Sequence, residues 1–117
     1  MNAIEIKGLT KNFGNKQALK GLNMTVPVGA IYGFIGENGS GKSTTEKLIC
    51  GLLVPNGGTI KLFGRDYTDA DVRAKIGVLI EAPGCFPNCT VWNNMMIQAA
   101  NLSLKNSEKE VRKVLRM

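Results

Sequence analysis

Residues Gly36-Glu-Asn-Gly-Ser-Gly-Lys-Ser-Thr44 (GENGSGKST) contain a glycine, four further residues and then Gly-Lys-Ser. This spacing is typical of a phosphate-binding loop that joins a strand to a helix. Glycines permit the positive φ angles of such a loop, so the backbone N–H groups of residues 38–42 can converge on phosphate oxygens at the positive end of the helix. The alternative is a Gly-rich turn with an exposed lysine, and the flanking pattern favours the nucleotide site.

Each side chain at the end of this loop has an expected role. Lys42 would lie between the β- and γ-phosphates as a point charge, and the Ser43 hydroxyl would ligate Mg²⁺. Thr44 can add a phosphate contact. The predicted site residues of the loop are Asn38, Gly39, Ser40, Gly41, Lys42, Ser43 and Thr44.

The flanks of the loop have the expected character. Residues 30–35 (AIYGFI) are almost wholly apolar, which predicts a strand buried on both faces. A helix should begin near Lys42, bury Leu48, Ile49 and Leu52, and end before Pro55.

The remaining segments predict a mixed α/β chain. Expected elements are antiparallel strands at 3–6 and 18–28, strands at 59–63 and 76–80 (the latter buried), a short helix at 69–75 capped by Thr68 or Asp69, a loop at 82–88, a helix from 90 and a last helix from 107. The last helix would carry Val111, Val114 and Leu115 on one face.

Composition limits the function classes. The chain has 117 residues, 44% of them hydrophobic, which fits one globular domain. No apolar run approaches the roughly 18 residues that a membrane helix needs. Three cysteines are an odd number that favours a reducing compartment, and without histidine the pair Cys85 and Cys89 makes a poor zinc site. The net charge of +6 attracts phosphates of any kind, but its scattered lysines favour a solvated surface over nucleic-acid binding.

Several segments in order resemble the ATP-binding subunits of ABC transporters. These segments are Leu9–Gly14 (LTKNFG), Ala18–Leu22 (ALKGL), Gly29–Gly36 (GAIYGFIG), Gly51–Leu53 (GLL) and Gly57–Ile60 (GGTI). The resemblance implies a P-loop NTPase core with an N-terminal antiparallel β subdomain and the start of a helical subdomain. Residues 1–89 would form the first two parts and residues 90–117 the last.

The resemblance also implies roles for two residues outside the loop. Phe13 stands where the family has an aromatic that stacks on adenine. Glu81 follows the predicted strand 76–80, at a place where the family has a glutamine that touches Mg²⁺ and the attacking water. Glutamate there, with Ala82–Pro87 after it, resembles the subgroup that serves immunity to lantibiotics and bacitracin-like peptides. The alternative for Glu81 is a solvated acid at the end of a strand.

The resemblance covers roughly the first half of such a domain. The family's second acidic strand end, LSGGQ-like signature and switch histidine are not found, since the Leu102-Ser103 pair continues without glycines and the chain has no histidine. We therefore expect the chain to bind Mg·ATP with little hydrolysis. Two alternatives stay open: a compact P-loop NTPase that uses Glu81, and a non-enzymatic interaction module.

The expected partners follow from the family. In the full protein, two copies would enclose ATP at the inner face of the cell membrane and drive a membrane permease, which residues 83–102 would contact. Nucleic acid is not an expected partner. Bacitracin-like or lantibiotic peptides are the cargo that the subgroup implies.

Overall fold

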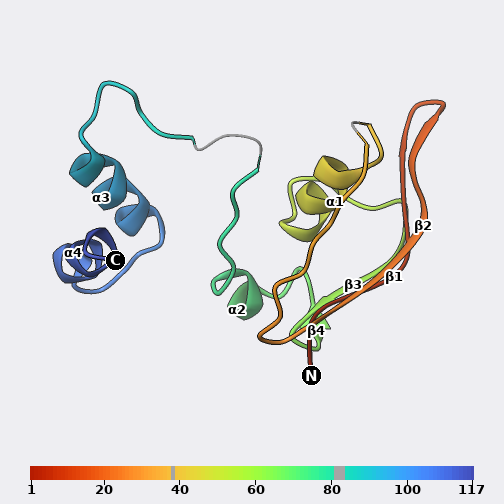
Figure 1. The fold of residues 1–117 in the computed structure, drawn as a ribbon, viewed down its shortest axis with the longest axis horizontal. Coiled ribbons are helices and arrows are strands. Elements are labelled where there is room, and N and C mark those ends of the chain that lie inside the picture. Colours follow the sequence, from red (N-terminus) through yellow and green to blue (C-terminus); the bar gives the residue numbers. More distant parts are fainter. Residues whose placement is uncertain (38, 81–83) are drawn as a thin grey trace. The chain divides into compact units, whose positions relative to one another are not determined.

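The computed structural model describes residues 1–37, 39–80 and 84–117. It divides into two compact units, Met1–Glu81 and Ala82–Met117. The first unit contains the sheet, the glycine-rich loop and the helix that follows this loop (Figure 1). The second unit contains two helices.

The sheet of the first unit is antiparallel throughout. Its four strands are β1 (Asn2–Phe13), β2 (Lys16–Pro27), β3 (Gly57–Leu62) and β4 (Arg65–Asp66), in the order β2-β1-β3-β4. β1 and β2 form a long hairpin, and β3 pairs with the other edge of β1 (Figure 1). The predicted antiparallel pair and the predicted strand at 59–63 are thereby confirmed, and the hairpin strands are longer than expected.

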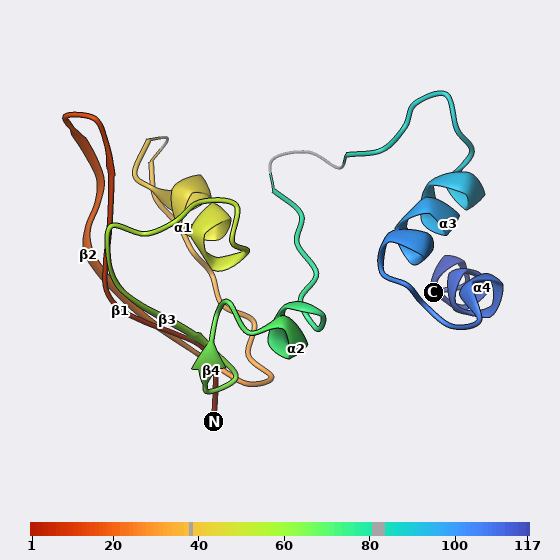
Figure 2. The ribbon, with the colours of Figure 1, turned by 180° about the vertical axis from the view of Figure 1, so that it is seen from behind.

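The core lies between the sheet and helix α1 (Lys42–Ile49). Alternate residues of the strands face it because side chains of a strand point to opposite faces in turn. Ile6 and Leu9 of β1, Ile60 of β3 and Leu48 of α1 are at most 1% exposed. Figure 2 shows α1 beside the long strands. Leu48 packs in the core with residues of the sheet, and this packing holds the helix that follows the loop against the sheet.

Helix α1 begins at Lys42, as predicted, but it ends at Ile49. Leu52 lies beyond its end and is 69% exposed, so the prediction that Leu52 is buried was wrong. Gly51 has φ 78°, a left-handed conformation that terminates helices. The chain turns away from the core before Leu52 can reach it.

Helix α2 (Ala70–Arg73) is held by the cap that the sequence offered. The Asp69 carboxylate accepts hydrogen bonds from the N–H groups of Asp71 at 2.9 Å and Val72 at 3.3 Å. These bonds satisfy donors that have no partner within the helix. Of the two predicted caps, Asp69 is therefore the one used, and Val72 is buried against the sheet core.

Two predicted buried strands do not form. Residues 30–35 and 76–80 are neither helix nor strand, and Ile31, Ile35 and Leu79 are 103%, 94% and 73% exposed. An apolar run becomes a central strand only when other strands pair with both of its edges. Among the described residues, the sheet contains only β1 to β4, and none of these pairs with either segment.

Gly58 marks a point of close backbone approach between β3 and β1. Its φ is 88°, and a Cβ atom there would lie 2.4 Å from the Gly8 carbonyl oxygen and 2.6 Å from Leu9 Cα. The ladder shifts register between Lys7 and Thr10, so the chain of β1 bulges toward Gly58. Only glycine fits this site.

We therefore expect Gly58→Ala to lower the free energy of unfolding by at least about 2 kcal/mol, because it adds a backbone clash to an unfavourable φ. Gly64→Ala is the matched control, since Gly64 has φ 78° and no atom within 4 Å of an added Cβ. Urea unfolding of both variants would measure the difference. Equal destabilisation by the two substitutions would contradict the clash.

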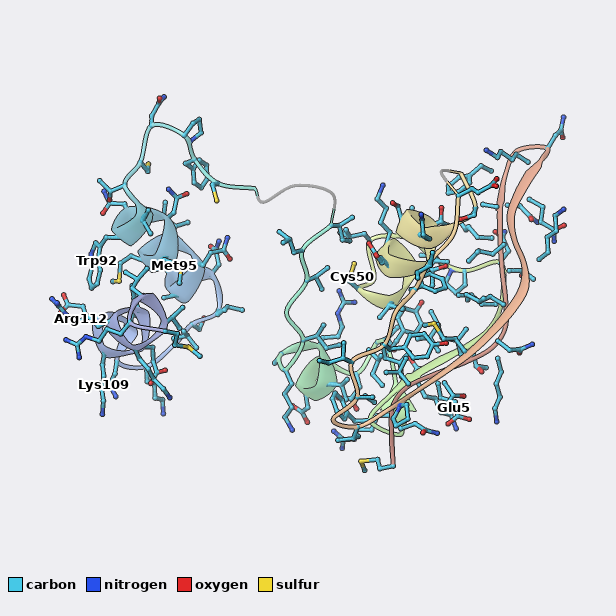
Figure 3. The ribbon with its side chains drawn as sticks, viewed as in Figure 1. Glu5, Cys50, Trp92, Met95, Lys109 and Arg112 are labelled. Carbon is cyan, nitrogen blue, oxygen red and sulfur yellow. The ribbon has the colours of Figure 1, made fainter. Side chains whose placement is uncertain are left out.

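The second unit packs α3 (Val91–Asn101) against α4 (Ser107–Leu115). Ala99 and Val111 are 3% exposed, whereas Val114 and Leu115 are 47% and 46% exposed, so the predicted apolar face of α4 is buried only at Val111. A pair of helices buries only the side chains along the line where the two helices touch, so the rest of each apolar face stays exposed. The Arg112 guanidinium lies 5.0 Å from the centre of the Trp92 ring, and Figure 3 shows this pair.

Within the described ranges, no helix combines the length and apolar character needed to cross a bilayer.

Candidate functional site

The glycine-rich loop passes into α1 through a residue that must be glycine. Gly41 has φ 102°, and a Cβ atom there would lie 2.7 Å from Leu19 Cδ2 and 3.1 Å from the Ala18 carbonyl oxygen. The loop therefore rests directly on β2. This contact joins the two parts of the site, since the hairpin supplies one wall and the loop supplies the other.

The amino end of α1 is open to an external anion. Its first intrahelical bond runs from Thr45 N–H to Gly41 O at 2.9 Å, so the N–H groups of Lys42, Ser43 and Thr44 precede the ladder. Gly41 provides no side-chain cap, and the first turn has no acidic residue. Positive charge of the helix dipole at this end is therefore left for a ligand such as phosphate.

Each of the other described helices has a side-chain cap or an acidic residue at the same end. The Thr90 hydroxyl caps α3 by accepting a bond from Asn93 N–H at 3.1 Å. Helix α4 carries Glu108 and Glu110 in its first turn, and α2 has its Asp69 cap. Helix α1 thus differs in having neither an acid nor a side-chain cap.

Two side chains hold the loop and the helix start in place. The Thr45 hydroxyl donates to Gly41 O at 2.8 Å and is 1% exposed as a residue. The Lys42 ammonium donates to the carbonyl oxygen of Gly36, at the beginning of the loop. Lys42 therefore closes the loop upon itself, with its charge next to the amide groups of the helix start.

A pocket of about 210 Å³ lies between the hairpin and the loop. Its lining residues are Phe13, Lys16, Ala18, Gly39, Gly41, Lys42, Ser43 and Thr44. The pocket offers an aromatic face, two ammonium groups and two hydroxyl groups. An aromatic group beside cations and backbone donors is a combination suited to a nucleotide, which has a base and phosphates.

Phe13 is held at the edge of this pocket by its neighbour on β1. Phe13 is 46% exposed, and the Lys11 ammonium lies 5.3 Å from the centre of its ring. The same ammonium donates to Val54 O at 2.7 Å. Lys11 is thus engaged with the protein, and it supports one face of the ring.

The structure brings together most of the site residues that the sequence indicated. Around the one pocket lie Phe13, Gly39, Gly41, Lys42, Ser43 and Thr44. Ser40 is next to them in the chain, but it does not line the pocket, and its N–H donates to Glu37 O at 3.0 Å. Asn38 and Glu81 lie outside the described residues.

Sequence reasoning missed Lys16 and Ala18 as members of the site. Lys16 stands opposite Phe13 in the β1–β2 ladder, so the register of the hairpin brings it to the pocket. A hairpin with Gly14 and Asn15 at its turn would have given this pairing. The turn residues Gly14 and Asn15 were therefore a signal for Lys16, but using this signal required the exact register of the hairpin.

The opposite end of α1 is linked to α2. The Arg73 guanidinium donates to Cys50 O at 2.9 Å, at the last carbonyls of α1. Figure 3 shows Cys50 at this end of the helix. A cation is favourable there because the carboxyl end of a helix carries partial negative charge.

A larger concavity of about 800 Å³ lies in the second unit. It is lined only by residues of α4 and its cap, from Asn106 to Arg116. None of the predicted site residues belongs to it. All of its lining residues come from one helix and its cap, whereas the smaller pocket joins groups from two parts of the chain, and we take the smaller pocket as the candidate site.

Comparison with known proteins agrees with this geometry. A sequence profile described as "ABC transporter" matches residues 19–117. The bacitracin transport ATP-binding protein BcrA of Bacillus licheniformis is 35% identical over 116 residues, which cover 96% of this chain and 38% of BcrA. The lantibiotic transport ATP-binding protein SrtF of Streptococcus pyogenes is 36% identical over 104 residues, which cover 89% of this chain and 45% of SrtF.

A solved structure of an ATP-binding subunit of an ABC transporter is similar in fold to this chain. It superposes with a TM-score of 0.78 at 29% sequence identity, covering 92% of this chain and 46% of that one. The chain thus spans less than half the length of each of these three proteins.

Proposed function

The chain belongs to the ABC transporter family, and from this premise we propose that it is the amino-terminal part of an ATP-binding subunit that holds Mg·ATP. The pocket between Phe13 and the GENGSGKST loop carries this proposal. Adenine would stack on Phe13, and the phosphates would lie against the loop and the start of α1. A purine ring and an aromatic side chain attract each other through their faces.

The phosphates would be bound mainly by the backbone. The N–H groups of Lys42, Ser43 and Thr44 precede the first hydrogen bond of α1, and no acidic side chain of its first turn competes for them. The Lys42 ammonium, which now donates to Gly36 O, would turn to the β- and γ-phosphates. Its exchange of a neutral acceptor for an anionic one is favourable, because hydrogen bonds to charged groups are stronger.

The residues present fit a magnesium ion bound together with the nucleotide. Mg²⁺ prefers oxygen ligands and keeps several waters and phosphate oxygens. The Ser43 hydroxyl lines the pocket and would supply one oxygen, and we propose the Glu81 carboxylate as another. When bound, the ion would neutralise charge on the phosphates. In this proposal, a carboxylate at position 81 adds a negative charge where the family has an amide.

We propose that the whole protein exports a peptide antibiotic. Relatives of this chain are named for bacitracin and lantibiotic transport, and the Glu81 subgroup resemblance points the same way. A membrane permease and a second copy of the ATP-binding subunit would be its partners. Residues 83–102, which include α3, would supply the permease contact at the inner face of the membrane.

We expect the 117-residue chain to bind Mg·ATP in isothermal titration, and Phe13→Ala to weaken this binding about tenfold, since stacking of a base on an aromatic ring contributes about 1–3 kcal/mol. Phe86→Ala is the control, because Phe86 is 53% exposed and lies in the other unit. No Mg·ATP binding by the unchanged chain would contradict the proposed function and favour a non-enzymatic interaction module.

Phosphate release measured in the same samples addresses hydrolysis. We expect little turnover, because the sequence has no histidine and no LSGGQ-like segment to complete a catalytic site. Steady hydrolysis by the chain alone, abolished by Glu81→Ala, would favour the compact NTPase instead.

A further inference from the structure

Lys16 is the second cation of the nucleotide pocket, and the sequence motif does not include it. It begins β2 and stands directly opposite Phe13 in the antiparallel ladder. Side chains of such a pair are close neighbours, with Cβ atoms about 4.5–5.5 Å apart. Lys16 therefore belongs to the same end of the hairpin as the ring proposed to hold adenine.

The hairpin also brings Lys16 to the phosphate side of the pocket. Lys16 and Ala18 both belong to β2, and both line the pocket. The loop rests on this part of β2, because a Cβ on Gly41 would meet the Ala18 carbonyl oxygen at 3.1 Å. Lys16 thus lines one pocket together with Phe13 and with the loop residues Lys42 to Thr44.

Its charge is available to a ligand, unlike that of its neighbours. The Lys11 ammonium is bound to Val54 O and packs on Phe13, and the Lys42 ammonium is bound to Gly36 O. Across residues 1–37, 39–80 and 84–117, the Lys16 ammonium makes no hydrogen bond or ion pair. A cation that lines a pocket without a protein partner can bind an anionic ligand at little cost in lost contacts.

We propose that Lys16 is a specificity-determining residue that binds the α-phosphate of a nucleoside di- or triphosphate. This inference rests on the proposed function, since it assumes that Phe13 holds the base. The α-phosphate is the phosphate nearest the sugar and base, and Lys16 is the pocket-lining cation that is paired with Phe13 in the ladder. Lys42, at the loop, serves the distal phosphates. The pocket then distinguishes a nucleotide from a nucleoside at two separate points.

Lys16→Gln is the test, with Lys20→Gln as the matched control. Lys20 lies on the same strand, is exposed and does not line the pocket. Equilibrium titrations of both variants and of the unchanged chain would use Mg·ATP, Mg·ADP and adenosine. We expect Lys16→Gln to weaken Mg·ATP and Mg·ADP by the same factor, about five- to tenfold, because both carry the α-phosphate. Adenosine affinity should not change.

Lys16→Arg provides a further readout that a purely structural role would not move. Arginine keeps the positive charge, so it should recover most of the affinity lost in Lys16→Gln. If Lys16→Gln binds both nucleotides as Lys20→Gln does, if it weakens adenosine equally, or if only Mg·ATP is affected, the assignment is overturned. If the unchanged chain binds no nucleotide, the proposed function fails, and the role of Lys16 fails with it.

Discussion

Lys42→Ala is expected to weaken Mg·ATP binding by roughly 10- to 100-fold, because it removes a charge-assisted hydrogen bond to the distal phosphates. In the structure, the Lys42 ammonium bonds to Gly36 O at the far side of the loop. Lys42 lines the pocket together with Ser43 and Thr44, so its side chain already belongs to the proposed phosphate site. The substitution removes this charge, whereas the amide groups of the helix start remain.

The measurement is an isothermal titration of Lys42→Ala with Mg·ATP at fixed ionic strength. Lys20→Ala is the control for net charge, because Lys20 is an exposed residue of β2 outside the pocket. Thermal melting of both variants would show whether the lost bond to Gly36 affects the fold. Equal Mg·ATP affinity for Lys42→Ala and Lys20→Ala would show that the loop is only a turn, which is the alternative that the sequence left open.

Leu48→Ala is expected to lower the free energy of unfolding of the first unit by about 2–5 kcal/mol. Leu48 is fully buried, and it is the residue of α1 that belongs to the sheet core. Its truncation leaves a cavity between helix and sheet, which the surrounding side chains fill only in part. Because α1 also carries the open N–H groups, nucleotide affinity should fall together with stability.

Leu52→Ala is the matched control for this change. It removes the same atoms four residues later, where the side chain is 69% exposed, and we expect an effect within about 0.5 kcal/mol. Urea unfolding followed by circular dichroism would measure both variants. Similar destabilisation by the two substitutions would contradict the helix end at Ile49 and restore the longer helix that the sequence predicted.

Local signals predicted the parts of the fold that local physics determines. The start of α1 follows from Gly41 and Lys42, because the left-handed glycine and the helix after it are neighbours in the chain. The Asp69 cap likewise acts on donors two and three residues later. Such features require no knowledge of distant segments, and sequence reasoning found them.

The predicted strands at 30–35 and 76–80 failed for the opposite reason. Their apolar character was read correctly, but a central strand also needs partners along both edges. Within the described part of the chain, the strands pair with one another and with neither segment. Hydrophobic periodicity reports which residues avoid water, and it does not report which strand will lie beside them.

The residues of the candidate site also fall into those that local sequence predicts and those that it does not. The loop residues were predictable from their spacing, whereas Lys16 entered the site only through the register of the hairpin. An exposed lysine near a turn is common on any protein surface, so its type alone carries little information. Its position opposite Phe13 depends on the exact register of the β1–β2 hairpin.

The exposed apolar segments at residues 30–35 and 76–80 determine the protein and salt concentrations at which solution experiments can be done. The exposed side chains of Ile31 and Ile35 give residues 30–35 an apolar surface that promotes association between molecules in water. The formal charge of +6 opposes contact between molecules, but this repulsion is screened within about 10 Å at 0.1 M salt. Dilute protein in low-salt buffer therefore favours monodisperse samples. High protein or salt concentration promotes precipitation, and a titration would then show a loss of signal that resembles weaker ligand binding.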